Sequence, residues 1–148
     1  MISFLHEVLR IIYVTYIVLA IHEAGHFIVA YKFAMAISSV EVGAGPRLTE
    51  FIWKGIWFRL YCLPLFGYVK TCWPSKKRWK NNALYLGGPA INLLTALLLY
   101  LIFQDLDKTT FCGVMTRISL GIGLGNLIPF RLWGMDSDGL QIMRSYFK

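Results

Sequence analysis

Residues 11–31 read IIYVTYIVLAIHEAGHFIVAY, an apolar stretch that is interrupted only by His22, Glu23 and His26. A helix of about 20 apolar residues is long enough to cross the hydrocarbon core of a lipid bilayer. The stretch therefore predicts a membrane-spanning helix. The hydrophobic residues that precede it extend the expected span to about residues 5–31.

Two further apolar stretches follow. Residues 83–103 contain no charged residue, and residues 111–130 contain only Arg117. They predict spans at about 83–103 and 111–129, because Pro129 should end the last helix. The Gly87-Gly88-Pro89 stretch is able to break or kink the second span, since irregular backbone is tolerated at membrane depth where protein or a wet cavity covers it.

The composition agrees with a membrane environment. Of the 148 residues, 57% are hydrophobic and 16% are charged, and the mean hydropathy is +0.56. Soluble domains carry about 45–50% apolar and about 25% charged residues. A water-soluble fold of this size would leave much apolar surface uncovered, so we expect a single membrane-embedded domain, residues 1–148.

The net charge of +7 arises entirely in residues 32–82, which hold nine basic and two acidic residues. This distribution is typical of a cytoplasmic loop between two membrane spans, and it favours contact with membrane lipid over binding of nucleic acid. We therefore expect a multi-pass protein of the bacterial cytoplasmic membrane. Its basic loop and C-terminus would lie in the cytoplasm, and its turn at 104–110 would lie outside.

The loop between the first two spans does not have the pattern of a helix. Its β-branched and aromatic residues are separated by glycine and proline, which predicts short strands or hairpins at the membrane surface over about 38–72. Two interpretations stay open, namely packing at the interface or a sheet edge that pairs with an extended substrate. Near the C-terminus, residues 137–147 predict a short helix capped by Ser137 or Asp136. The expected fold is thus membrane α-helical, with three transmembrane helices, a small interfacial β region between the first and second, and a short C-terminal helix.

Residues 22–26 read HEAGH, which is the pattern H-E-x-x-H on a predicted helix. Positions i and i+4 lie on one helix face, so both imidazoles can reach one Zn²⁺ ion while Glu23 acts as general base on its water. In a soluble protein the same five residues often hold only a solvated pair of histidines. Within an apolar span, ionisable groups cost several kcal/mol and are usually functional, so the pattern predicts a metal site. Asp136 and Asp138 are the candidates for a third ligand.

Several motifs occur in an order that resembles the site-2 protease family of intramembrane metalloproteases, over about residues 11–142. They are HEAGH at 22–26, LPLFGYVK at 63–70 (the family's P-x-G-G-Y-V element with Phe66 in place of its first glycine), GGPAIN at 87–92, and NLIP at 126–129 followed by Asp138-Gly139.

This resemblance implies a zinc metalloendopeptidase that cuts membrane-spanning or membrane-inserted peptides or proteins within or near the bilayer. It implies zinc ligation by His22, His26 and Asp138, and catalysis by Glu23. It also implies that Asn92, with Asn126 as a second candidate, binds substrate backbone or the oxyanion. The nine-residue step from Pro129 to Asp138 is longer than usual for the family. Asp136 therefore competes as the third ligand, although Gly139 after Asp138 favours Asp138.

Other functions remain open from the sequence alone. The small size and the long step before Asp138 would also suit a non-catalytic membrane subunit that binds zinc or substrate, although a pure binding site needs no buried base such as Glu23. Histidine and aspartate within spans would suit a metal transporter, although three spans offer no evident pathway without oligomerisation. A homo-oligomer is an expectation that the sequence leaves open.

Overall fold

The computed structural model describes residues 2–72, 75–104, 107, 109–132 and 134–147. Within them, the chain forms four helices and two pairs of antiparallel strands. The elements are α1 (Ile2–Lys32), β1 (Ile37–Trp53), β2 (Ile56–Thr71), α2 (Arg78–Phe103), α3 (Phe111–Leu127), β3 (Arg131–Leu132), β4 (Met135–Asp136) and α4 (Asp138–Tyr146).

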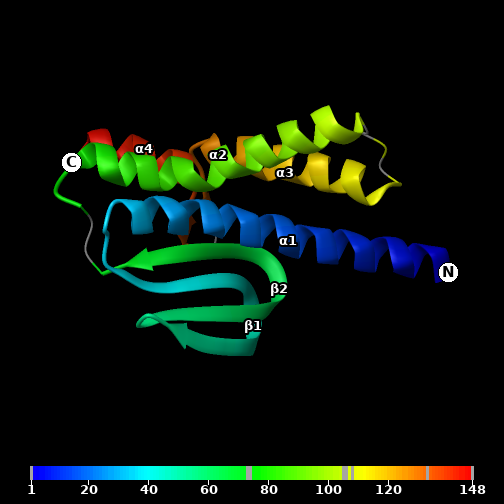
Figure 1. Cartoon of the computed structure of the whole chain (residues 1–148), viewed down its shortest axis with the longest axis horizontal. Coiled ribbons are helices and arrows are strands. Elements are labelled where there is room, and N and C mark those ends of the chain that lie inside the picture. Colours follow the sequence, from blue (N-terminus) through cyan, green and yellow to red (C-terminus); the bar gives the residue numbers. More distant parts are fainter. Residues whose placement is uncertain (1, 73–74, 105–106, 108, 133, 148) are drawn as a thin grey trace.

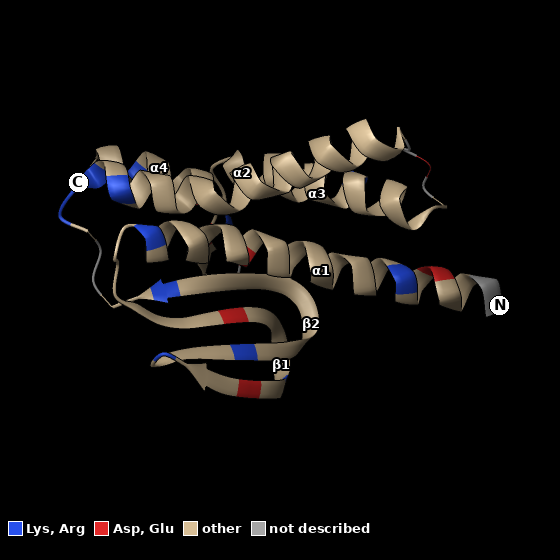
Figure 2. Ribbon diagram, in the orientation of Figure 1, with Lys and Arg blue, Asp and Glu red and all other residues tan. Residues whose placement is uncertain are grey.

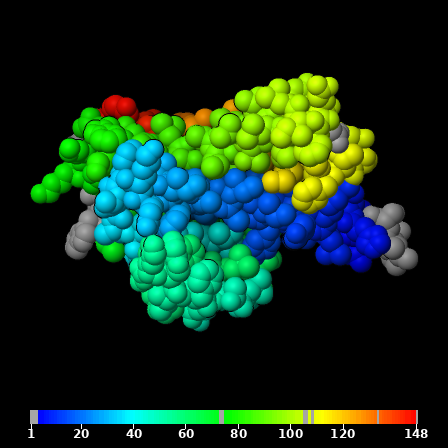
Figure 3. Space-filling model, in the orientation of Figure 1, coloured from blue at the N-terminus to red at the C-terminus, as the bar shows by residue number. Residues whose placement is uncertain are grey.

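Helix α1 forms the middle layer of the molecule. The β1–β2 sheet covers one side of it, and α2, α3 and α4 lie along the other side (Figure 1). The space-filling view shows the same order of layers (Figure 3). A residue on α1 can therefore face either the sheet or the other helices, which places the HEAGH motif between the two.

Among the described residues, two helices are long and apolar enough to cross a membrane, namely Phe4–Lys32 and Arg78–Phe103. Only 17% and 28% of their most apolar windows are buried within the protein, so most of these apolar side chains lie on its surface. Helix α3 is apolar but has 17 residues, about 26 Å of helix against a hydrocarbon core of about 30 Å. The third transmembrane span thus stays a prediction.

Strands β1 and β2 are long and bent, so each contributes two segments to the sheet. Val40 of β1 pairs with both Val69 and Phe58 of β2, which places the 37–42 segment of β1 between the two arms of β2. The arm that ends at Thr71 lies beside α1 and forms one edge of the sheet (Figure 1). The predicted β region over about 38–72 is confirmed, and its strands are longer than expected.

A buried carboxylate ties these segments together. Glu41 is 6% exposed and accepts hydrogen bonds from Ser39, Arg59 and Tyr61 at 3.0, 2.9 and 2.8 Å. Burial alone would raise the pKa of Glu41, but the hydrogen bonds from Tyr61, Ser39 and Arg59 outweigh it and hold the pKa below its usual value. Glu41 therefore stays ionised and links β1 to β2 at the centre of the sheet.

Helix α2 continues through Pro89 without a break, so the break considered at 87–89 does not occur. The glycines serve close packing instead. A Cβ atom on Gly25 of α1 would lie 2.7 Å from the backbone carbon of Gly87 and 2.6 Å from Cγ2 of Ile91. The two helices can approach this closely only because neither position carries a side chain.

The turn after α3 brings the chain back toward α1. Helix α3 ends at Leu127, close to the end expected from Pro129. The Ser137 hydroxyl donates to the carbonyl of Ile128 at 2.8 Å and accepts from the amides of Phe130 and Leu140 at 3.0 and 3.2 Å. Ser137 thus caps α4, as predicted, and it also fastens the loop that positions the next residue, Asp138.

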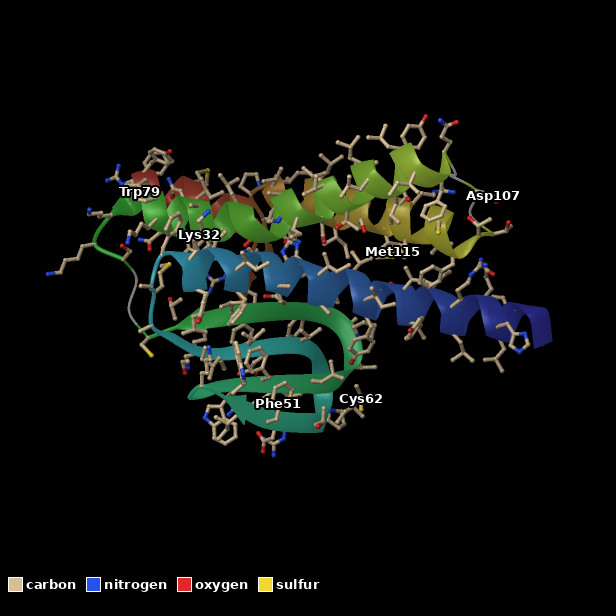
Figure 4. All side chains as sticks on the ribbon, viewed as in Figure 1. Lys32, Phe51, Cys62, Trp79, Asp107 and Met115 are labelled. Atoms are coloured by element: carbon tan, nitrogen blue, oxygen red, sulfur yellow. The ribbon has the colours of Figure 1, made fainter. Side chains whose placement is uncertain are left out.

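One end of the helices is rich in basic residues. Lysine and arginine gather where α1 ends, α2 begins and α4 ends (Figure 2). Lys32 and Trp79 lie at this end of the molecule, and Asp107 lies at the opposite end (Figure 4). Residues 105, 106 and 108 of the predicted outer turn lie outside the described residues.

Candidate metal centre

His22 and His26 lie one turn apart on the buried face of α1, at 4% and 7% exposure. Their rings meet edge to face with centroids 4.8 Å apart, and their Nε2 atoms are 3.2 Å apart. The helical spacing of the motif alone produces this pair, because side chains at i and i+4 share one face.

The third member arrives from α4, more than a hundred residues away in sequence. The two carboxylate oxygens of Asp138 lie 3.1 Å from Nε2 of His22 and 3.4 Å from Nε2 of His26. Each Asp138 oxygen therefore faces one histidine nitrogen, so the carboxylate lies across the pair.

The hydrogen bond at Nδ1 of His26 determines whether its Nε2 is free to ligate a metal. Nδ1 of His26 lies 2.7 Å from the carbonyl oxygen of Leu84 in α2, closer than the backbone nitrogen of Gly88 at 3.3 Å. A carbonyl oxygen has no proton, so Nδ1 donates in this shorter contact, and in the neutral ring Nε2 then carries a lone pair. That lone pair faces the Asp138 carboxylate and the Nε2 of His22, an arrangement that a cation between them would stabilise.

Zinc fits this donor set. Ligands at about 2.0–2.1 Å from one tetrahedral zinc ion lie roughly 3.3 Å from one another. The separations among the two Nε2 atoms and the Asp138 oxygens are 3.1, 3.2 and 3.4 Å. Two imidazoles and one carboxylate are also the ligand types of catalytic zinc sites, which keep a fourth position open. His22, His26 and Asp138 would therefore hold the ion.

Glu23 lies beside this cluster. Its ligand atom and those of the two histidines are all within 4.8 Å of one another, and it is 2% exposed. Among the described residues, nothing donates a hydrogen bond to its Oε2. The sheet edge holds the side chain in place, since a Cβ atom on Gly67 would lie 2.8 Å from both Cγ and Oε1 of Glu23. A buried carboxylate oxygen without a partner is suited to accept a proton from a reacting molecule.

The remaining candidates occupy different surroundings. Asp136 lines the same cavity, but its carboxylate forms ion pairs with Arg144 and, at 3.5 Å, with Arg131. Asn126, in the last turn of α3, lines the cavity beside the site. Asn92 is fully buried, and its side-chain nitrogen lies 3.2 Å from Nδ1 of His22.

A cavity of about 650 Å³ opens onto the cluster. One wall is the edge of β2 at residues 64–69, and the others come from the helices and from the loop between α3 and α4. Glu23, both histidines and Asp138 line this cavity. A polypeptide segment that enters it would therefore reach the candidate metal ligands and Glu23 together.

Sequence reasoning missed three parts of the site: the Leu84 carbonyl, the Gly67 backbone against Glu23, and the Ser137 clamp on the loop. Every residue has a backbone carbonyl, so the sequence could not indicate the one of Leu84. The second was detectable only as a glycine within the LPLFGYVK element. Ser137 was identified as a helix cap, and its contacts with the loop depend on the tertiary fold.

Comparison with known proteins agrees with this geometry. The sequence model described as peptidase family M50 matches residues 10–108. "Putative zinc metalloprotease Cj1068" of Campylobacter jejuni is 30% identical over 139 residues, which cover 83% of this chain and 35% of that protein. A Chlamydia pneumoniae protein with the same description is 31% identical over 107 residues, which cover 57% of this chain and 17% of that protein.

The fold and the site thus define a helical protein with a buried two-histidine, one-aspartate centre beside a glutamate. The chain belongs to peptidase family M50. It spans about a third or less of the length of the two relatives described above. Membership of the family and the two apolar helices together indicate a membrane protein.

Proposed function

We propose that this chain is an intramembrane zinc metalloendopeptidase. One observation carries the proposal: two Nε2 atoms and a carboxylate converge at zinc-ligand separations, next to a buried Glu23 oxygen that no described residue engages. A site that only bound metal would gain nothing from a second, unpartnered carboxylate, because burying such a group is costly.

Each residue has a distinct task in the reaction. His22, His26 and Asp138 would hold zinc, which when bound would supply the Lewis acid that acidifies water and polarises the scissile carbonyl. Glu23 takes a proton from the attacking water and returns it to the leaving amide nitrogen. The peptide bond is thereby hydrolysed to a carboxylate and an amine.

The proposed substrate is a membrane-spanning or membrane-inserted peptide. Two features support it: the site lies on a helix that is apolar enough to span a bilayer, and the edge of β2 at 64–69 forms one wall of the cavity. An extended peptide that paired with this edge would present its backbone beside Glu23. Helical substrates would have to unwind locally before they are cut.

The experiment compares the wild-type chain with Glu23→Gln, expressed in bacterial membranes. We expect Glu23→Gln to lower cleavage by about 10²–10⁴-fold, the usual contribution of a general base. Mass spectrometry of the membrane peptidome would measure cleavage, and elemental analysis of the detergent-purified protein should find about one zinc per chain in both forms.

Glu7→Gln is the matched control, because it makes the same change on the same helix at a half-exposed side chain far from the histidines. It should leave both cleavage and zinc content unchanged. Equal peptidomes for the wild type and Glu23→Gln would instead assign the chain to a non-catalytic zinc-binding or substrate-binding role.

A further inference from the structure

Asn92 of α2 has no exposed surface, and its side chain lies against the ring of His22. Its side-chain nitrogen lies 3.2 Å from Nδ1 of His22, whereas Asp138 lies 3.1 Å from Nε2 on the other edge of the same ring. Asn92 and Asp138 therefore hold His22 between them. An asparagine in this position is separated by the imidazole from anything that His22 and Asp138 bind.

One atom of the Asn92 side-chain amide has no hydrogen-bond partner among the described residues. This atom is Oδ1, which is buried. The two ends of an amide have nearly the same shape, so a half-turn exchanges Oδ1 and Nδ2 without any change in packing. After that exchange Oδ1 lies about 3.2 Å from Nδ1 of His22, within hydrogen-bonding distance for an N–H donor.

The chemistry of His22 determines which orientation is correct. A neutral imidazole has one protonated and one bare nitrogen, and only the bare nitrogen can ligate a metal. Because Nε2 of His22 faces Asp138 and His26, a metal-binding ring must carry its proton on Nδ1. That proton needs an acceptor, and the amide oxygen of Asn92 provides one.

We propose that Asn92 is a positioning residue, whose amide oxygen accepts a hydrogen bond from Nδ1 of His22 and fixes this ring as a metal ligand. The inference rests on the proposed function and assigns Asn92 a role different from contact with substrate. The Leu84 carbonyl does the same for His26 at 2.7 Å. Helix α2 thus supports both histidines of α1, one through its backbone and one through a side chain.

The test measures zinc affinity in detergent by competition with a chelator. Asn92→Leu keeps the size of the side chain but removes the acceptor, and we expect it to weaken zinc binding about 10–100-fold, as is usual for loss of a group that orients a metal ligand. Asn92→Asp retains an acceptor, and its affinity should stay within about threefold of wild type. Asn81→Leu is the matched control on the same helix, since Asn81 bonds only to Ser75 among the described residues.

A second measurement does not depend on the folding of any Asn92 variant. In a His6→Gln background, zinc-loaded protein with ¹⁵N-labelled histidine should show both remaining rings protonated at Nδ1. A ring protonated at Nε2 would overturn the inference, as would Asn92→Leu with wild-type affinity, or Asn92→Asp as weak as Asn92→Leu. A wild-type chain that binds no zinc would overturn the proposed function as well, so the two failures are distinguishable.

Discussion

Two aspartates that stand two residues apart have opposite surroundings. Asp136 ends β4 and pairs with Arg131 and Arg144, whereas Asp138 begins α4 and faces His22 and His26. Ser137 lies between them and caps α4, so the chain passes from strand to helix between the two aspartates. In the sequence, only the Gly139 that follows Asp138 favoured Asp138, and nothing there predicts the arginine partners of Asp136.

At this scale we predict that Asp138→Asn lowers zinc affinity by more than about 100-fold. A residue that only orients a ligand contributes about 10–100-fold, so a ligand itself should contribute more. Asp136→Asn should keep wild-type zinc content after dialysis, as measured by elemental analysis. The reverse result would make Asp136 the ligand and would contradict the arrangement of the loop.

At the scale of elements, the contact between α1 and α2 positions the histidines against their supports. Gly25 and Gly87 allow the two helices to touch, and the same contact brings Leu84 and Asn92 to His26 and His22. The Gly87-Gly88-Pro89 stretch therefore forms part of an interface between helices. The sequence had also allowed a break in the helix at this point. Helix packing and metal geometry are linked through this contact.

We predict that Gly25→Ala lowers the free energy of unfolding by about 1–3 kcal/mol, the usual cost of overpacking. Its new methyl group would lie 2.7 Å from the backbone of Gly87, which cannot move aside cheaply. Gly121→Ala is the matched control on α3, where nothing lies within 4 Å of the added Cβ. Thermal unfolding in detergent should show a lower Tm for Gly25→Ala and no loss for Gly121→Ala.

At the scale of the whole molecule, the basic residues gathered at one end of the helices favour one orientation in a membrane. The basic end contains Lys32 and Trp79, and Asp107 marks the other end (Figures 2 and 4). Basic residues beside membrane spans are retained on the cytoplasmic side. We therefore propose that residues 32–82 and the C-terminus lie in the cytoplasm and that the turn near Asp107 lies outside.

Labelling of single cysteines with a membrane-impermeant maleimide tests this orientation. Cys72 is exposed at the basic end, and Thr109 is exposed at the other end, so each can be the sole cysteine after Cys62 and Cys112 are changed to serine and, for Thr109→Cys, Cys72 as well. Intact bacterial spheroplasts should label Thr109→Cys and leave Cys72 unlabelled until lysis. The opposite pattern would invert the topology, and labelling of both from one side would show that α2 does not span.

The sequence by itself determined the apolar helices, the paired histidines with their glutamate, the β region and the cap of α4. Each of these depends on spacing or composition within a short window, which helical and strand periodicity translate directly into structure. Membership of the family also followed from motifs that are visible in the linear order. The break considered in α2 did not occur, because glycine and proline signal both irregular backbone and close helix packing.

Only the tertiary structure decided which aspartate meets the histidines, which backbone carbonyl holds His26, and where Asn92 stands. These contacts join residues that are 58 to 116 positions apart in the chain. Their formation depends on how three helices and a capped loop pack together, and a residue's type does not record which distant partner that packing will bring within hydrogen-bonding distance.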